Sequence, residues 1–381
     1  MKPKIIIAGA GGIGKAVGLI LACSDALDCD IAFGDINEDA LKASAKFVKE
    51  GSSNRVIPET FLMSKSGANA SMKKQFRSAD IILDCLPGSI APRIATFARE
   101  HNMHYANLTE YVNETEEVIK IAKGAKTAFV LQTGLAPGFI NVLACRLFED
   151  FTKENKVSTV DQIKMKVGAL SQHALSPHYY AFTWSPIGVA TEYLKDAIVV
   201  RDFKKKLVSA LSGRERIIID GDEYEDNFTS GGAADLPDAF SGKVRALDYK
   251  TLRYVGHYEW VDTILSSLPQ GSDKIRLLER IMLNTIPSVE DDEVLIYAAA
   301  TGKDKKGRLR SKERSYKIYP SIVGTKKLRA IQSTTACALC QIAYMLLTTK
   351  GWKGAVFQSE IPTDDFLNGP FVKEVYGGYE S

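Results

Sequence analysis

The stretch K-I-I-I-A-G-A-G-G-I-G-K-A-V-G-L-I-L, residues 4–21, decides the fold of this chain. A short apolar run leads into a glycine-rich turn, and an apolar pattern with helical spacing follows at once. A G-x-G-x-x-G motif between a strand and a helix is the dinucleotide-binding fingerprint, because its glycines permit a tight turn, close approach of a pyrophosphate and close helix packing. Free N–H groups and the helix dipole favour an anion at the helix N-terminus. We therefore predict a dinucleotide site built by Gly9, Gly11, Gly12, Ile13 and Gly14.

The end of the second predicted strand indicates which cofactor binds. The run Ile31–Phe33 leads to Asp35, about 20 residues after the last glycine, where an acidic side chain bonds the ribose 2′-hydroxyl. A carboxylate at this place repels a 2′-phosphate, and the acids Glu38 and Asp39 add to that repulsion. We therefore predict NAD as the cofactor in preference to NADP.

A second loop is expected to touch the cofactor. Asp84-Cys85-Leu86-Pro87-Gly88 follows the fourth predicted strand. Ligands of doubly wound folds lie across the carboxyl ends of the strands, so Cys85, Leu86 and Pro87 are expected near the nicotinamide ribose. The alternative is that Pro87-Gly88 is an ordinary turn.

Length and composition are those of a soluble protein with two domains. The chain has 381 residues, of which 45% are hydrophobic and 25% charged. A net charge of +3 is too small to indicate a nucleic-acid or membrane partner. There is no long uncharged apolar run and no secretory signal, so we expect a cytoplasmic location. Cys337-x-x-Cys340 lies in an apolar run and is expected to be buried, so we predict no metal site.

Strand and helix patterns alternate over the first 150 residues, which predicts a parallel, doubly wound sheet. Strands are predicted at residues 4–8, 30–34, 55–62, 80–85, 103–107 and 127–132. Helices are predicted near residues 13–23, 37–50, 71–77, 90–101, 113–124 and 138–150.

The pattern changes after about residue 155. Residues 160–170 alternate between polar and apolar side chains, as an antiparallel strand does, and further short strands are predicted at 198–200, 216–219 and 248–254. Residues 294–300 and 314–319 are expected to form a hairpin with an exposed basic tip. The apolar segment 331–347 is predicted to be a helix that returns to the first domain.

These patterns predict an α/β chain with a Rossmann-type doubly wound parallel sheet and a second, α+β domain with a mainly antiparallel sheet. We place the NAD-binding domain at 1–132 and 331–350. The substrate-binding and dimerisation domain is expected at 133–330, and a C-terminal tail that packs on the body at 351–381.

Several segments resemble the saccharopine dehydrogenase family, and the lysine dehydrogenase and saccharopine reductase-like branch is the most similar. The similarity lies in G-L-A-P-G-F-I-N at 134–141, Y-A-F-T-W-S-P at 180–186, D-Y-K-T-L-R-Y-V-G-H at 248–257 and I-Q-S-T-T at 331–335. It extends over nearly the whole chain. One departure is Ala336, which stands where the family usually has glycine after the paired threonines.

The resemblance implies a Rossmann domain joined to a domain that binds an amino acid and supports a homodimer. It also implies NAD(P)-dependent oxidation of a C–N bond in lysine, saccharopine or a polyamine-related substrate.

The chemistry of such a reaction suggests roles for residues of the second domain. Arg253 is a candidate anchor for a substrate carboxylate, since guanidinium and carboxylate form bidentate pairs. Lys250 is a candidate proton carrier or second anchor, and His257 is a candidate general acid or base because its reference pKa is near neutrality. The other expected substrate-pocket residues are Tyr180, Trp184, Thr251 and Glu110.

Each assignment has a structural alternative. Lys250 and Arg253 could both lie on a solvated sheet face. His257 follows Gly256 and could belong to a turn or cap, and Trp184 could be a core residue.

The sequence thus predicts an NAD-dependent oxidoreductase acting on the CH–NH or CH–NH2 bond of an amino acid, similar to lysine dehydrogenase or saccharopine dehydrogenase. The alternatives are a polyamine-forming synthase of the same family and a non-catalytic NAD-binding redox sensor. The sensor stays open because a fold alone does not establish an activity.

Overall fold

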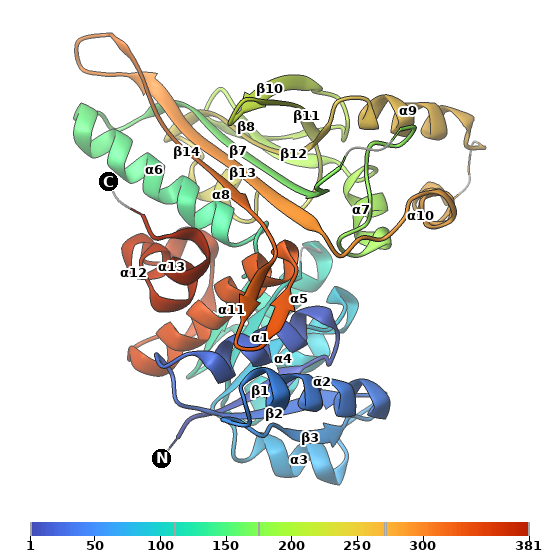
Figure 1. Ribbon diagram of the computed structural model, residues 1–381. Coiled ribbons are helices and arrows are strands. Elements are labelled where there is room, and N and C mark those ends of the chain that lie inside the picture. Colours follow the sequence, from blue (N-terminus) through green and yellow to red (C-terminus); the bar gives the residue numbers. More distant parts are fainter. Residues whose placement is uncertain (1, 110–111, 174–175, 270, 272, 380–381) are drawn as a thin grey trace. The chain divides into compact units, whose positions relative to one another are not determined.

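The computed structural model describes residues 2–109, 112–173, 176–269, 271 and 273–379. The chain forms two compact units, drawn in Figure 1. The first unit contains the chain up to Phe139, the segment Ser321–Leu328 and the chain from Gln332 onward. The second contains Ile140–Pro320 and Arg329–Ile331.

A seven-stranded sheet forms the centre of the first unit, in the order β17-β6-β5-β4-β1-β2-β3, and all its neighbouring strands are parallel. The strands are β1 (Lys4–Ala8), β2 (Asp30–Asp35), β3 (Glu59–Leu62), β4 (Ile81–Asp84), β5 (His104–Asn107), β6 (Ala128–Val130) and β17 (Gly354–Val356). They alternate with α1 (Gly12–Cys23), α2 (Glu38–Gly51), α3 (Ala70–Phe76), η1 (Gly88–Ile90), α4 (Ala91–Glu100) and α5 (Val112–Ala122). The predicted doubly wound α/β fold is confirmed.

Helices on the faces of this sheet leave its central strands without solvent contact. Ile5, Ile6 and Ile7 of β1 are fully buried, which explains why β1 is apolar on both faces instead of alternating. The carboxyl ends of β1, β2 and β4 are neighbours, because β1 pairs with both of the other strands. The predicted cofactor loops therefore begin side by side, at the carboxyl ends of neighbouring strands.

The second unit contains a mixed eight-stranded sheet. Its main order is β10-β11-β12-β7-β13-β14, and β8 pairs with β12 and β9. The strands are β7 (Val160–Ser171), β8 (Ala197–Arg201), β9 (Lys204–Val208), β10 (Glu215–Ile219), β11 (Asp222–Phe228), β12 (Val244–Tyr254), β13 (Asp292–Lys303) and β14 (Leu309–Ile318). Its helices are α6 (Phe139–Asn155, whose first residue belongs to the first unit), α7 (Pro186–Glu192), α8 (Leu236–Ala239), α9 (His257–Ser267) and α10 (Lys274–Thr285).

The mainly antiparallel sheet and the hairpin of β13 and β14 are confirmed, with one correction. Strand β7 is antiparallel to β13 but parallel to β12, so its alternating pattern identified the strand but not the direction of both its neighbours. Strands β9 and β11 were not predicted, because their sequences K-K-K-L-V and D-E-Y-E-D-N-F are rich in charge.

The C-terminal region contributes β15 (Ser321–Val323), β16 (Lys326–Leu328), α11 (Ala330–Thr348), η2 (Gln358–Glu360), α12 (Thr363–Leu367) and α13 (Pro370–Tyr376). From Gln332 onward α11 belongs to the first unit, where the Cys340 thiol lies 3.7 Å from the Val17 carbonyl of α1. Helix α11 is long and apolar enough to cross a membrane, but 72% of its most apolar window is buried, as in a core helix. Strand β17, which lies in the segment expected to be a C-terminal tail, adds an edge strand beside β6.

Candidate functional site

The glycine turn of the first unit has the geometry that a dinucleotide requires. Gly9 has a φ of +104°, and a Cβ there would lie 2.9 Å from the carbonyl carbon of Cys85. A Cβ at Gly14 would collide with the Gly9 carbonyl, so the helix and the turn approach too closely for a side chain. A Cβ at Gly11 would meet no atom within 4 Å, which leaves the backbone open to a ligand. The three glycines thus have the three roles that the motif predicts.

The Cys85–Pro87 loop lies beside this turn. The Cys85 N–H donates to the Ala8 carbonyl at 2.8 Å, and the Leu86 N–H donates to Asp84 Oδ1 at 3.1 Å. Because β1 and β4 are paired, the structure brings both predicted cofactor loops together.

Asp35 is held by backbone donors at the same edge. Its Oδ2 accepts from the Ala10 N–H at 2.7 Å, and its Oδ1 accepts from the Asn37 N–H at 2.9 Å. An ionised carboxylate can accept about four hydrogen bonds, so Asp35 retains capacity for a ribose hydroxyl. The glycines, the Cys85 loop and Asp35 therefore fit a nicotinamide dinucleotide.

A buried carboxyl that the sequence reasoning did not assign lies under this edge. Asp84 is 2% exposed, and its Oδ2 accepts from the Tyr105 hydroxyl at 2.8 Å. Burial raises the pKa of Asp84 to about 7, although the hydrogen bonds from Tyr105 and the Leu86 N–H act in the opposite direction.

A second group of predicted residues meets in the other unit, around Arg253. This side chain is 1% exposed and has no ion pair with a carboxylate among the described residues. Its Nε donates to the Tyr193 hydroxyl at 2.7 Å and its Nη1 to the Leu252 carbonyl at 2.9 Å, whereas Nη2 has no hydrogen-bond partner in the described part of the chain. Glu225 stands opposite Arg253 across the strand ladder, but its carboxylate accepts from the Tyr258 N–H. A buried guanidinium with a free donor is suited to bind an anion.

Aromatic rings surround this guanidinium. Its Cζ lies 4.6 Å from the ring centre of Tyr180 and 5.5 Å from that of Tyr193. Among the described residues the Tyr180 hydroxyl is buried without a well-formed hydrogen bond, although Trp184 acts on it. The guanidinium of Arg253 thus lies against the Tyr180 ring.

The other predicted pocket residues have structural contacts. Trp184 packs on α7, where a Cβ at Gly188 would collide with its ring. The Thr251 hydroxyl shares a hydrogen bond of 2.6 Å with Thr229. Glu110 lies outside the described residues.

His257 is fully buried at the start of α9. Its Nε2 lies 2.9 Å from the Tyr193 hydroxyl, and its Nδ1 lies 2.6 Å from the His178 carbonyl oxygen. Burial and the neighbouring Arg253 charge lower the pKa of His257 to about 3. The side chain is therefore neutral near pH 7.

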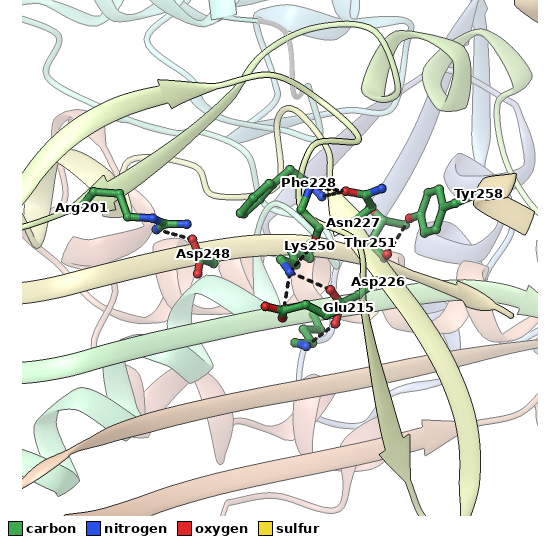
Figure 2. Close-up of polar contacts among 11 residues, drawn as sticks. Arg201, Glu215, Asp226, Asn227, Phe228, Asp248, Lys250, Thr251 and Tyr258 are labelled. Carbon is green, nitrogen blue, oxygen red and sulfur yellow. Dashed lines mark hydrogen bonds and ion pairs between the residues drawn. The ribbon is translucent and has the colours of Figure 1, made fainter. Parts of the chain in front are cut away.

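Lys250 and Arg253 are both buried, so the solvated-face alternative is wrong. They also lie on opposite faces of β12, because their positions differ by an odd number of residues. Lys250 Nζ contacts Asp226 Oδ1 at 2.9 Å, Glu215 Oε2 at 2.9 Å and the Gly213 carbonyl at 2.6 Å. Figure 2 shows Lys250 between these two carboxylates. One hydrogen bond and two ion pairs therefore tie the Lys250 ammonium to the protein itself, as expected for a cation that stabilises the fold.

The sequence analysis did not identify the residues that contact Lys250 and Arg253 on the two faces of β12. Asp226 also pairs with Lys166 of β7, and Tyr193 connects Arg253 with His257. The acidic strand containing Glu225 and Asp226 gave no apolar signal, and Tyr193 follows a helix too short to show a pattern. Among the described residues, no group of three or more His, Cys, Asp or Glu side chains is placed to hold a metal.

Comparison with known proteins extends this description. Residues 5–131 match the family model of the saccharopine dehydrogenase NADP binding domain, and residues 134–377 match that of the saccharopine dehydrogenase C-terminal domain. The chain belongs to the saccharopine dehydrogenase family. The resemblance seen in the sequence is thereby confirmed, and the first unit is a nicotinamide-dinucleotide-binding domain of this family.

A relative with detectable sequence similarity is the mitochondrial alpha-aminoadipic semialdehyde synthase of Mus musculus. It is 22% identical over 198 residues, which are 51% of this chain and 20% of the mouse protein. The matched part therefore spans about one fifth of that relative.

Solved structures share the fold of this family member. Saccharopine dehydrogenase (L-Glu forming) from Saccharomyces cerevisiae gives a TM-score of 0.76 at 15% identity and covers 99% of this chain and 98% of its own. Homospermidine synthase from Legionella pneumophila, solved with NAD, gives 0.65 at 13% identity and covers 100% of this chain and 92% of its own.

Proposed function

We propose that this protein is an NAD-dependent oxidoreductase that acts on the C–N bond of an amino acid, as lysine dehydrogenase-like or saccharopine dehydrogenase-like enzymes do. The observation that carries the proposal is Arg253, a buried guanidinium whose Nη2 has no hydrogen bond and which, among the described residues, has no carboxylate within ion-pair distance, although the charge of Glu192 acts on it. Burying such a charge costs free energy unless a bound anion compensates it. The carboxylate of an amino-acid substrate is an anion of matching shape.

The residues of the chain would bind and orient the reactants. Arg253 would hold a substrate carboxylate, and the Tyr180 ring and hydroxyl would border the bound group. The glycine turn, the Cys85 loop and Asp35 would hold NAD+, which would supply a hydride acceptor for oxidation of the C–N bond. Water would hydrolyse the resulting imine, breaking its C=N bond to give a carbonyl and a free amine. Such positioning raises rates by holding the reactants in a reactive geometry.

Asp35 supports NAD in preference to NADP. Its carboxylate is fixed by the Ala10 and Asn37 N–H groups, so it cannot easily turn away from a 2′-phosphate. The family model is named for NADP, whereas the Legionella structure holds NAD. Our preference for NAD therefore rests on the side chain of this protein.

The same guanidinium disfavours the polyamine alternative. A polyamine carries only positive charge and would be repelled by a buried cation. Saccharopine and lysine both carry carboxylates, which Arg253 would attract.

Purified protein with NAD+ tests the proposal against a panel of L-saccharopine, L-lysine, putrescine and spermidine. We expect NADH formation with a carboxylate-bearing substrate. Turnover of the polyamines alone would favour the synthase, and NADH binding without any turnover would favour the redox sensor.

A further inference from the structure

A hydrogen-bonded chain links the loop at His178 to the Arg253 guanidinium. The His178 carbonyl contacts His257 Nδ1, His257 Nε2 contacts the Tyr193 hydroxyl, and that hydroxyl contacts Arg253 Nε. The three distances are 2.6, 2.9 and 2.7 Å. The links come from a loop, α9, α7's C-terminal end and β12, so the chain connects separate elements of the second unit.

The chemistry of its two ends fixes the direction of every bond. A carbonyl oxygen only accepts, so His257 Nδ1 carries the proton that reaches His178. A guanidinium Nε only donates, so the Tyr193 oxygen accepts from Arg253. A neutral imidazole then has its lone pair at Nε2, and the Tyr193 hydroxyl donates to it. Each of the three hydrogen bonds between His178 and Arg253 thus has one donor proton and one acceptor.

A protonated His257 would break this order. Its Nε2–H and the Arg253 Nε–H would both point at the Tyr193 oxygen, and the Tyr193 proton would lose its acceptor. Two cations would also share one buried oxygen. The lowered pKa of His257 agrees with the neutral form. Among the described residues, the polar or titratable groups that face its ring are those of His178, Tyr180, Tyr193, Arg253, Tyr258 and Trp260.

We propose that His257 is a positioning residue for the carboxylate-binding Arg253 and not a proton carrier. Its neutral ring orients the Tyr193 hydroxyl, which fixes Nε of the guanidinium and leaves Nη2 free for the ligand. This inference rests on the proposed function, because it assigns Arg253 to the substrate.

The loop that contains His178, at one end of this hydrogen-bonded series, is also held in place by packing. Gly256, directly before His257, has a φ of +104°, and a Cβ there would lie 2.7 Å from the Tyr179 ring. The loop around Tyr179 therefore packs against the backbone of Gly256, and the His178 carbonyl of the same loop accepts a hydrogen bond from His257 Nδ1. Both contacts hold His257 in one orientation.

Two substitutions at His257 separate the two roles. His257→Gln places an amide oxygen near the position of Nε2 and can still accept from Tyr193, whereas His257→Phe cannot accept. For positioning, we expect His257→Phe to raise KM for L-saccharopine about tenfold, with kcat changed by less than about threefold, and His257→Gln to restore most of the loss. Loss of a proton carrier would instead lower kcat about 10²- to 10⁴-fold in both variants, which would overturn the proposal.

Nitrogen NMR of protein labelled at histidine and arginine tests the arrangement without any substrate. We expect the His257 signals, assigned by their loss in His257→Gln, to show Nδ1 protonated and Nε2 unprotonated from about pH 5 to about pH 8. The Arg253 Nε signal, assigned with Arg253→Lys, should shift in His257→Phe and return toward the wild-type position in His257→Gln. A His257 titration within that range, or an Arg253 signal unmoved by His257→Phe, would contradict the inference even if the panel of substrates shows no turnover.

Discussion

Arg253 and Lys250 are buried cations on the same strand, but their partners differ. Lys250 has two carboxylates and a carbonyl, whereas Arg253 has a hydroxyl and a carbonyl and retains a free Nη2. At the scale of the residue, this difference separates a cation that stabilises the fold from one suited to bind a ligand. We therefore assign Lys250 a structural role.

Asp35 gives the first prediction at this scale. Asp35→Ser removes the charge that faces the 2′ position of the ribose, so NAD affinity should fall about tenfold and NADP affinity should rise. Fluorescence titrations with NADH and NADPH measure both effects. Tighter binding of NADPH than of NADH by the wild-type protein would refute the assigned preference.

Asp84 gives a prediction about pH. Burial raises its pKa from the ordinary value of about 4 to about 7 in the folded protein, so the folded state holds a proton that the unfolded state has lost between these values. Its contribution to stability is therefore greatest at low pH and is lost as pH rises toward 7. The thermal midpoint of the wild type should fall relative to that of Asp84→Asn between about pH 5 and about pH 8. An equal gap at both pH values would contradict the raised pKa.

At the scale of the element, β7, β10, β11 and β12 are joined by one buried charge cluster. Asp226 of β11 pairs with Lys250 of β12 and Lys166 of β7, and Glu215 of β10 also contacts Lys250. Both lysines and Asp226 are almost without solvent contact. The two acids lie on the neighbouring strands β10 and β11 and the two lysines on the neighbouring strands β12 and β7, so their pairing favours one register of these four strands.

Asp226→Asn should therefore destabilise the fold strongly, because two buried ammonium groups lose their shared counter-ion. We expect the free energy of unfolding to fall by about 3–5 kcal/mol, measured by urea denaturation. The matched control is Glu223→Gln on the same strand, which breaks an exposed pair with Arg216 and should change stability little. Similar effects of the two substitutions would show that the buried cluster adds nothing specific.

The sequence revealed those elements whose burial follows a simple pattern. Six of the seven strands of the first sheet were predicted, because they are apolar runs between glycines and helical patterns, whereas the short edge strand β17 was not. Strand β11 escaped because Glu225 and Asp226 are buried as charges whose partners come from distant segments. Arg253 could be proposed as an anchor from its motif, but its free Nη2 and the link through Tyr193 depend on contacts that no local pattern contains.

At the scale of the whole molecule, we predict a homodimer formed through the sheet of the second unit. Strands β10 and β14 are edges of that sheet, and each exposes a large apolar side chain, Ile218 at 71% and Leu309 at 70%. Exposed edges with apolar side chains favour association with another chain. Light scattering should give twice the monomer mass of 41.8 kDa, and a mass of 41.8 kDa over a wide concentration range would exclude the dimer.

We propose that the first unit binds a nicotinamide dinucleotide and that Arg253 of the second unit binds the carboxylate of the substrate. The most direct test is Arg253→Ala, assayed for NAD+-dependent turnover of L-saccharopine and for NADH affinity, with the exposed Arg216→Ala on β10 as the control. We predict that Arg253→Ala raises KM about tenfold to a hundredfold and leaves NADH affinity nearly unchanged, whereas Arg216→Ala changes neither. Unchanged saccharopine kinetics in a folded Arg253→Ala protein would contradict the account.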